Sequence, residues 1–170
     1  MSAVDPEAYT RGMRQLAAAV TIVTTSHEGE RRGLTATAVC SLAATPPTLL
    51  ACINRLAGAH DMIAASGRFC VNVLAEEHAA LSQRFAGAET GETRFAMGSW
   101  GELATGAPAL AEALASFDCE LLHRIEVETH SIFIGRVVAV VSHPGRRPLL
   151  YSDGCYVGLA ALPGIMADRP

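Results

Sequence analysis

The chain has 170 residues and a mass of 17.8 kDa, the length of one ordinary domain with a sizeable buried core. Hydrophobic residues make up 50% of it and charged residues 18%, which excludes a disordered chain or a charged tail. The net charge is −4, no segment concentrates basic residues, and all 13 basic residues are arginine, so neither nucleic-acid binding nor lysine chemistry is expected.

Cysteine spacing and the placement of charges bear on the cellular compartment. The five cysteines stand far apart with no CxxC pair, so we expect buried thiols in a reducing environment. Asp5 and Glu7 interrupt the start of the chain, so no signal peptide is expected and a cytoplasmic location is predicted. The uncharged residues 33–54 contain Pro46 and Pro47, which favours two strands joined by a turn over a membrane helix.

A helix and two strands are predicted at the start of the chain. Asp5 can cap a helix whose first position suits Pro6, and the apolar side chains that follow share one face. The β-branched run over residues 19–25 predicts a strand. Residues 27–30 are typical of a turn, and a second strand is expected at about 32–37.

The middle of the chain alternates short strands with two helices. Strands are predicted at residues 39–44, 48–54 and 69–74. Residues 55–60 form a loop into a short helix that ends near Gly67, and a second helix is predicted over 77–85. Residues 86–106 are glycine-rich and polar, which predicts a long loop.

The last third predicts an antiparallel β-structure. Residues 116–128 alternate apolar and polar side chains, and residues 132–142 are β-branched. Residues 149–151 and 155–157 flank Ser-Asp-Gly, which is a hairpin signal. About eight strands that follow one another without regular β-α alternation indicate a mainly β fold. We expect a closed or nearly closed antiparallel barrel with peripheral helices, in a single domain over residues 1–170 with its core at about 5–160.

Most common site patterns are absent from the sequence. There is no GxGxxG, no GxSxG, and no pair of histidines at metal-ligand spacing among the six. The stretch GLTATAVCS at residues 33–41 remains, because small and hydroxyl side chains on strands let a flat ligand approach the backbone. Threonine is also an ordinary strand residue, and composition alone favours that plainer interpretation.

Three consecutive blocks carry a family resemblance: residues 33–41, residues 45–50 (TPPTLL) and residues 52–55 (CINR). Together with FCVNVL at residues 69–74 and SFDC at residues 116–119, they resemble the short-chain flavin reductase family. The chain is most similar to the reductase components of two-component monooxygenases, such as those of 4-hydroxyphenylacetate hydroxylation and pyrimidine degradation. The resemblance covers about residues 5–160.

The resemblance implies a split β-barrel homodimer of the FMN-binding type. It would bind FMN or FAD, and NADH or NADPH would reduce the flavin by hydride transfer to N5. Reduced flavin would then diffuse to a partner flavin-dependent monooxygenase, with no metal, nucleic acid or membrane involved. Residues 39–53 carry few charges, which also predicts that part of the surface they form is buried in a dimer interface.

The resemblance also implies site residues. Those expected to bind the flavin are Thr35, Ala36, Thr37, Ala38, Ser41, Cys52, Asn54, Arg55, Gly58, Ala59, His60, Phe85 and Gly87. Those expected on the nicotinamide side are Leu150, Tyr151, Ser152, Asp153 and His130, with His130 as the catalytic residue.

The loop after Arg55 departs from the family pattern. Many relatives have serine or threonine there, whereas residues 56–59 of this chain carry no hydroxyl. Phosphate binding would then depend on backbone amides, Arg55 and the start of the following helix. Two alternatives stay open: an oxidoreductase that keeps its flavin and reduces another acceptor, and a non-enzymatic flavin-binding module.

Overall fold

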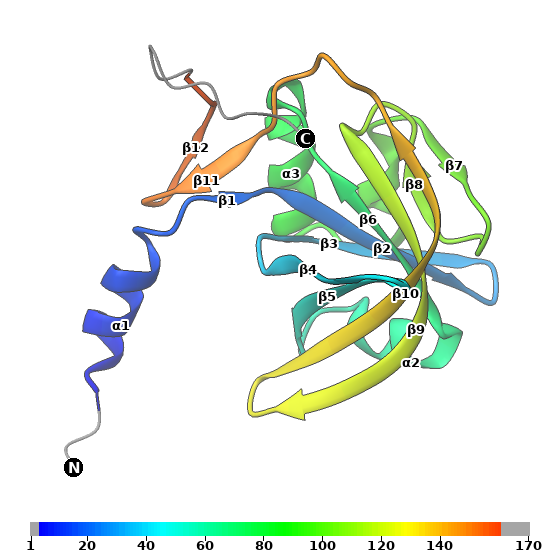
Figure 1. Ribbon diagram of the computed structural model, residues 1–170, viewed down its shortest axis with the longest axis horizontal. Helices are drawn as coiled ribbons and strands as arrows, with labels where there is room; N and C mark the ends of the chain where they lie inside the picture. The colour runs from blue at the N-terminus through cyan, green and yellow to red at the C-terminus, as the bar shows by residue number, and fades with distance from the viewer. Residues whose placement is uncertain (1–3, 161–170) are drawn as a thin grey trace.

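Seven antiparallel strands form the main sheet in the computed structural model, which describes residues 4–160 (Figure 1). Their order across the sheet is β3-β2-β6-β9-β10-β5-β4. The strands are β2 (Thr21–His27), β3 (Glu30–Ala36), β4 (Val39–Ala44), β5 (Pro47–Asn54), β6 (Arg68–Val73), β9 (Ala115–Val127) and β10 (His130–Ser142). The prediction of a mainly β, antiparallel fold is confirmed.

The sheet is curved but open along one line. Its two edge strands, β3 and β4, follow each other in the chain and share no ladder among the described residues. β3 ends its pairing where Ala36 faces Thr21 on β2, and β4 begins where Val39 faces Ala51 on β5. No closed barrel is found among residues 4–160, so of the closed or nearly closed barrel that the sequence suggested, the closed form is wrong.

The β9–β10 pair contains two irregularities in its register. The register of this pair shifts between Ile134 and Gly135, and again between Val137 and Ala139. A Cβ atom on Gly135 would lie 2.6 Å from Cζ of Phe69 and 2.8 Å from Cβ of Cys119. The glycine therefore lets β10 bend tightly over the core.

Two apolar clusters hold the sheet and helices together. The first lies inside the curved sheet around Val23, Ile53 and Phe69, and α2 (His60–Ser66) covers it through Ile63. The second lies on the other face, where α3 (Ala79–Ala86) and the 3₁₀ helix η2 (Gly91–Ala96) pack on β2 and β3. It contains Val20, Ile22, Leu74, Leu81, Phe85 and Phe95.

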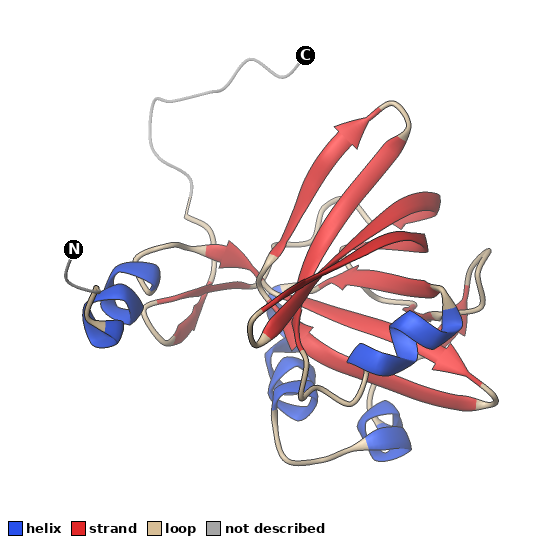
Figure 2. Ribbon diagram, turned by 90° about the horizontal axis from the view of Figure 1, so that it is seen from below, coloured by secondary structure: helices blue, strands red, loops and turns tan. Residues whose placement is uncertain are grey.

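A small arm stands apart from the main sheet, as Figure 2 shows. It consists of α1 (Pro6–Met13), β1 (Ala18–Ala19), β11 (Leu150–Ser152) and β12 (Cys155–Val157). As predicted, Asp5 caps α1 by accepting hydrogen bonds from the amides of Glu7 and Ala8. The backbone N–H of Asp153 donates to the carbonyl of Arg14, which fastens the end of α1 to the β11–β12 hairpin.

Short elements were missed by the sequence interpretation. The expected loop at residues 86–106 contains η2 and β7 (Trp100–Glu102), and β7 pairs with β8 (Pro108–Leu110). The expected helix over 77–85 begins instead as a 3₁₀ turn, η1 (Glu76–His78). Three-residue strands are too short to show a hydrophobic period, so only their tertiary partners define them.

Two further expectations concern the membrane and the cysteines. No helix within residues 4–160 has the length and apolar character needed to cross a membrane. All five cysteines are free, and Cys70 and Cys119 are buried as expected. Cys40 and Cys155 are exposed, contrary to that expectation, because they lie on the uncovered edge strand β4 and in the arm.

Candidate active site

The opening between the two edge strands is the centre of the candidate site. Thr37 and Ala38 belong to neither strand, and both are exposed. The carbonyl of Ala38 accepts a hydrogen bond of 2.9 Å from the amide of Cys52 on β5. A flat ring can lie against this stretch, because its side chains are small and both residues are exposed.

The end of β5 meets the β9–β10 hairpin beside this opening. Asn54 pairs with His130 across the β5–β10 ladder. The amide of Arg55 donates to the carbonyl of Thr129 at 2.9 Å, and its guanidinium donates to the carbonyl of Glu128 at 3.4 Å. Asn54, Arg55 and His130 are therefore exposed neighbours at one end of the sheet.

His60 lies behind the loop rather than on its surface. Its side chain is 3% exposed, with Nδ1 2.7 Å from Oδ1 of Asp61 and Nε2 2.9 Å from Oγ of Ser131. The Asp61 carboxylate can only accept, so Nδ1 carries a proton toward it, and in the neutral ring Nε2 is then the acceptor for the Ser131 hydroxyl. The ring also meets the edge of Phe133 at a centroid distance of 5.2 Å. His60 therefore ties the loop to β10, one residue from His130.

Three other predicted residues are turned away from the opening. The hydroxyl of Thr35 donates to the carbonyl of Ser82 at 2.6 Å, and so faces α3. Phe85 is buried on the same side, where a Cβ on Gly33 would lie 2.8 Å from its ring. Ala36 packs against the cluster inside the sheet. In the TATA stretch, Thr37 and Ala38 are thus the exposed pair.

The predicted nicotinamide segment lines one wall of a pocket of about 240 Å³. Tyr151, Ser152 and Asp153 face Thr37 across it, and Arg14 of the arm closes one side. Leu150 is half-buried and pairs with Ala19 rather than lining the pocket. The structure thus brings Thr37 together with residues 151–153, whereas His130 is not among the residues that line this pocket.

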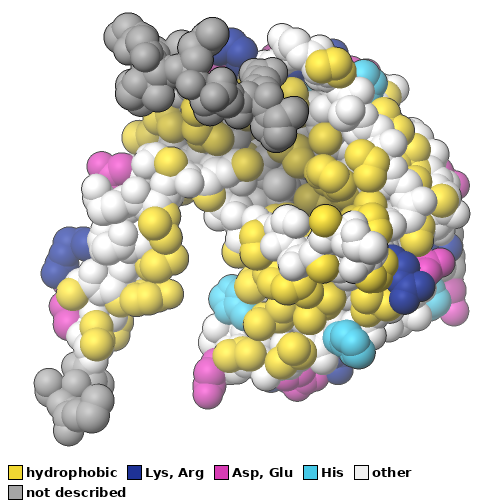
Figure 3. Space-filling view, viewed as in Figure 1, with side chains coloured by type: hydrophobic (Ala, Val, Ile, Leu, Met, Phe, Trp, Pro, Cys, Tyr) yellow, Lys and Arg dark blue, Asp and Glu magenta, His cyan; other side chains and the backbone are white. Residues whose placement is uncertain are grey.

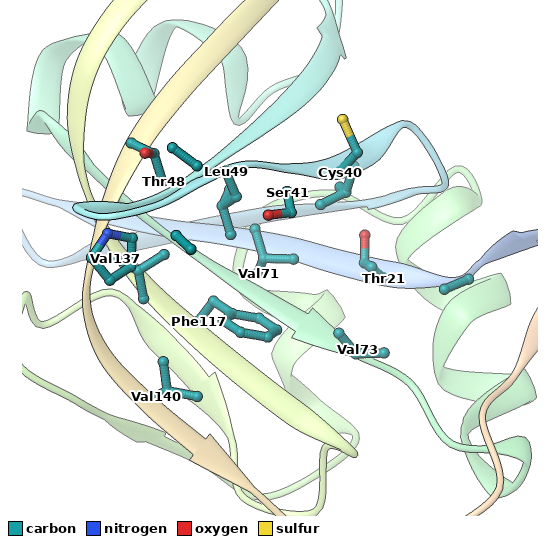
Figure 4. Close-up of a pocket in the computed structure, with 15 residues that line it drawn as sticks. Thr21, Cys40, Ser41, Thr48, Leu49, Val71, Val73, Phe117, Val137 and Val140 are labelled. Atoms are coloured by element: carbon teal, nitrogen blue, oxygen red, sulfur yellow. The ribbon is translucent and has the colours of Figure 1, made fainter. Parts of the chain in front are cut away.

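A larger apolar cavity opens on the concave side of the sheet, with a volume of about 490 Å³ (Figure 4). Ser41 lies on its wall, facing Val71 and Phe117 across the cavity. Its other lining is mostly small or aliphatic and comes largely from β4, β5 and β10, with Ala19, Thr21 and Val73 completing it. The sequence interpretation missed this cavity, and its one signal was the lack of charge over residues 39–53.

The remaining predicted residues fall into the loop and the strand below it. Gly58 is exposed, Ala59 is buried, and Gly87 is exposed at the end of α3. Burial raises the pKa of the Cys52 thiol, and the neighbouring Cys40 adds to this increase. Cys52 is therefore a neutral thiol near pH 7 and not a thiolate nucleophile.

The residues at the opening are suited to stacking against a flat ring and orienting it rather than to acid–base chemistry. Within residues 4–160, no three histidine, cysteine or acidic side chains gather as a metal site would require. The exposed backbone at residues 37–38 fits a flat aromatic ring, and Asn54, Arg55 and His130 supply polar groups at its border. An open antiparallel sheet with exposed small residues between its edge strands is compatible with a planar ligand lying there.

Comparisons with known proteins identify the family. The chain belongs to the Flavin reductase like domain family, whose pattern it matches over residues 13–160. It is 45% identical to the FMN reductase (NADH) RutF of Ancylobacter novellus over 161 residues, 95% of this chain and 89% of that protein. The resemblance seen in the sequence is thereby confirmed.

Solved structures agree with this assignment. A crystal structure described as a flavin reductase from Haemophilus somnus superposes with a TM-score of 0.89 at 40% identity, covering 92% of this chain and all of the other. BorF, the flavin reductase component of a bacterial two-component tryptophan halogenase, has a TM-score of 0.85 at 30% identity and covers 93% of this chain and 100% of BorF.

Proposed function

We propose that this protein is an NADH-dependent flavin reductase that reduces FMN and releases the reduced flavin to a separate monooxygenase. The observation that supports this most is the exposed backbone at Thr37 and Ala38 in a chain that belongs to the flavin reductase family over residues 13–160. NADH loses a hydride to flavin N5, and the flavin takes one proton from solvent, so NAD⁺ and reduced flavin are the products.

For this reaction the protein mainly has to hold the nicotinamide ring of NADH against the flavin ring. Thr37 and Ala38 would contact the flavin through their backbone, with Asn54 and Arg55 at its border. Tyr151, Ser152 and Asp153 would form the wall on the nicotinamide side. His130 would orient the nicotinamide, and no general acid or base is needed for the hydride transfer itself.

The nature of the relatives supports FMN, NADH and a partner enzyme. The relative in Ancylobacter novellus is named as an FMN reductase that uses NADH. BorF is described as one component of a two-component system. An exposed, shallow site suits a flavin that must leave, and such a flavin should bind at about micromolar affinity, about −8 kcal/mol.

A direct test compares NADH and NADPH oxidation by the purified protein with FMN, FAD, riboflavin or no flavin added. We expect NADH turnover that saturates with added FMN. Flavin that remains bound through dialysis, with turnover that ignores added flavin, would favour an oxidoreductase that keeps its flavin. Flavin binding without NADH oxidation would instead favour a non-enzymatic flavin-binding module.

We also propose that two copies of the chain form the working unit. α1 buries none of its residues in its own chain, and Leu42 on β4 and Val140 on β10 are each 53% exposed. Figure 3 shows hydrophobic side chains on both sides of the hollow between α1 and the main sheet. A second copy seated there would cover this apolar surface. Sedimentation at micromolar concentration should give a dimer, and a monomer would contradict the proposal.

A cytoplasmic location is part of this proposal. All five cysteines are free thiols, which suits a reducing compartment. NADH is available in the same compartment, so the hydride donor and the enzyme would meet there.

A further inference from the structure

Arg32 lies where three separate segments of the chain meet. It belongs to β3, and its side chain lies between the loop at residues 55–59 and the start of η2. A Cβ atom on Gly58 would be 3.9 Å from its Cδ, and one on Gly91 would be 3.5 Å from its Nη1. Both neighbours are glycines, so the guanidinium is flanked by backbone without side chains.

Two neighbouring arginines, Arg31 and Arg94, already bind partners within the chain. Arg31 forms an ion pair with Glu92 through two of its nitrogens, and its Nη2 donates to Oε2 of Glu92 at 2.6 Å. Arg94 donates to three backbone carbonyls, those of Gly33, Gly87 and Glu89. These contacts fasten η2 and the preceding loop to β3, and they leave little of either guanidinium for a ligand.

Arg55, which the sequence interpretation assigned to phosphate, is directed elsewhere. Its Nη1 donates to the carbonyl of Glu128, and its Nη2 lies 4.0 Å from the carboxylate of Glu126. Both partners belong to the tip of the β9–β10 hairpin. The arginine whose aliphatic stem lies beside Gly58 is Arg32, since a Cβ atom on Gly58 would be 3.9 Å from its Cδ.

The present partners of Arg32 are of a kind that a ligand can replace. Its Nη2 lies 2.6 Å from Oε2 of Glu30, and its Nη1 donates to the carbonyl of Arg31 at 2.9 Å. Within residues 4–160, its Nε has no hydrogen-bond partner. The Glu30 side chain is 60% exposed, and such surface pairs contribute little to stability. A phosphate dianion carries more charge than a carboxylate and matches the guanidinium fork.

We propose that Arg32 binds the phosphate group of the flavin, exchanging Glu30 for it, and that this contact gives the enzyme its preference for FMN over riboflavin. The proposal rests on the proposed function and deepens it. It also explains how residues 56–59 can serve a phosphate without a hydroxyl, since Gly58 lets the ligand approach Arg32 directly. Glu30 competes for the same guanidinium, which keeps the affinity low enough for release.

The test compares flavins with and without a phosphate in Arg32→Gln. Binding is followed by quenching of flavin fluorescence, which needs no turnover, and KM is measured with saturating NADH. We expect the dissociation constant for FMN to rise about tenfold or more, because one charge-assisted contact is lost, while that for riboflavin changes less than about twofold. Glu30→Gln should do the opposite and tighten FMN alone.

Arg136→Gln is the matched control, because Arg136 is an exposed arginine on β10 and its loss changes the net charge equally. It should leave the ratio of FMN to riboflavin affinity unchanged. If Arg32→Gln weakens the binding of both flavins alike, or of neither, the assignment of Arg32 is overturned, while NADH turnover by the wild-type protein tests the reductase function separately. If the wild-type protein binds both flavins but oxidises no NADH, the proposed function fails while the affinity ratio still tests Arg32.

Discussion

The hydrogen-bonded pair of His60 and Ser131 offers a sharp test of how the loop at residues 55–59 is held. Replacing His60 by alanine removes the bond from the Ser131 hydroxyl and leaves that hydroxyl, which is fully buried, without its partner. An unpaired buried hydroxyl costs about 1–3 kcal/mol. The lost edge contact with Phe133 adds about 0.5–1.5 kcal/mol. With the cavity left by the ring, we expect a loss of about 3–5 kcal/mol in the free energy of unfolding.

Urea denaturation at one protein concentration measures this loss, and a double-mutant cycle with Ser131→Ala isolates the pair. Ser131→Ala should cost less than His60→Ala, because His60 keeps Asp61 and Phe133. The two changes together should cost about 1–2 kcal/mol less than their sum. Purely additive losses would refute the inferred contact.

A kinetic readout separates positioning from bulk stability. His60 connects the loop to β10 next to His130, so its loss should raise KM for flavin in protein that is still folded. His60→Gln, which can reach Ser131 with its amide, should recover most of the wild-type value. An unchanged KM in folded His60→Ala would mean that the residue serves stability alone.

Three more changes test other parts of the structure. Gly135→Ala should destabilise the protein by about 1–3 kcal/mol in urea denaturation, because the new methyl group would meet the buried Phe69 at 2.6 Å, and a neutral result would contradict the tight bend. The hydrogen bond from Arg31 lowers the pKa of the Glu92 carboxyl, so this pair stabilises the folded protein above the unfolded-state pKa and the contribution is lost as pH falls through the folded-state pKa. Glu92→Gln should therefore lower Tm more at about pH 7 than at about pH 3, and an equal decrease at both would contradict the ion pair. The raised pKa of Cys52 predicts slower alkylation at pH 7 than at the exposed Cys155, which mass spectrometry of peptides can compare, and equal rates would contradict it.

Much of the local structure could be read from residue order alone. The Asp5 cap, the strand at residues 39–44, the turn at Gly67 and the β11–β12 hairpin depend on neighbours within a few residues, and each is present where it was predicted. The blocks that carry the family resemblance are likewise contiguous. The flavin reductase family could therefore be recognised before any fold was known.

The arrangement of the site was decided by tertiary contacts. Strand pairing leaves the sheet open between β3 and β4, and no local pattern records which strand a residue will pair with. The same holds for side-chain direction: Thr35 and His60 are turned inward by Ser82 and Ser131, which lie 47 and 71 residues away along the chain. Arg32 and Arg55 are both arginines near the loop, and only their tertiary surroundings distinguish them: Arg32 lies beside Gly58 and Gly91, whereas Arg55 donates to the carbonyl of Glu128. Chain neighbours determine which elements form, whereas residues distant in sequence determine which groups face the ligand.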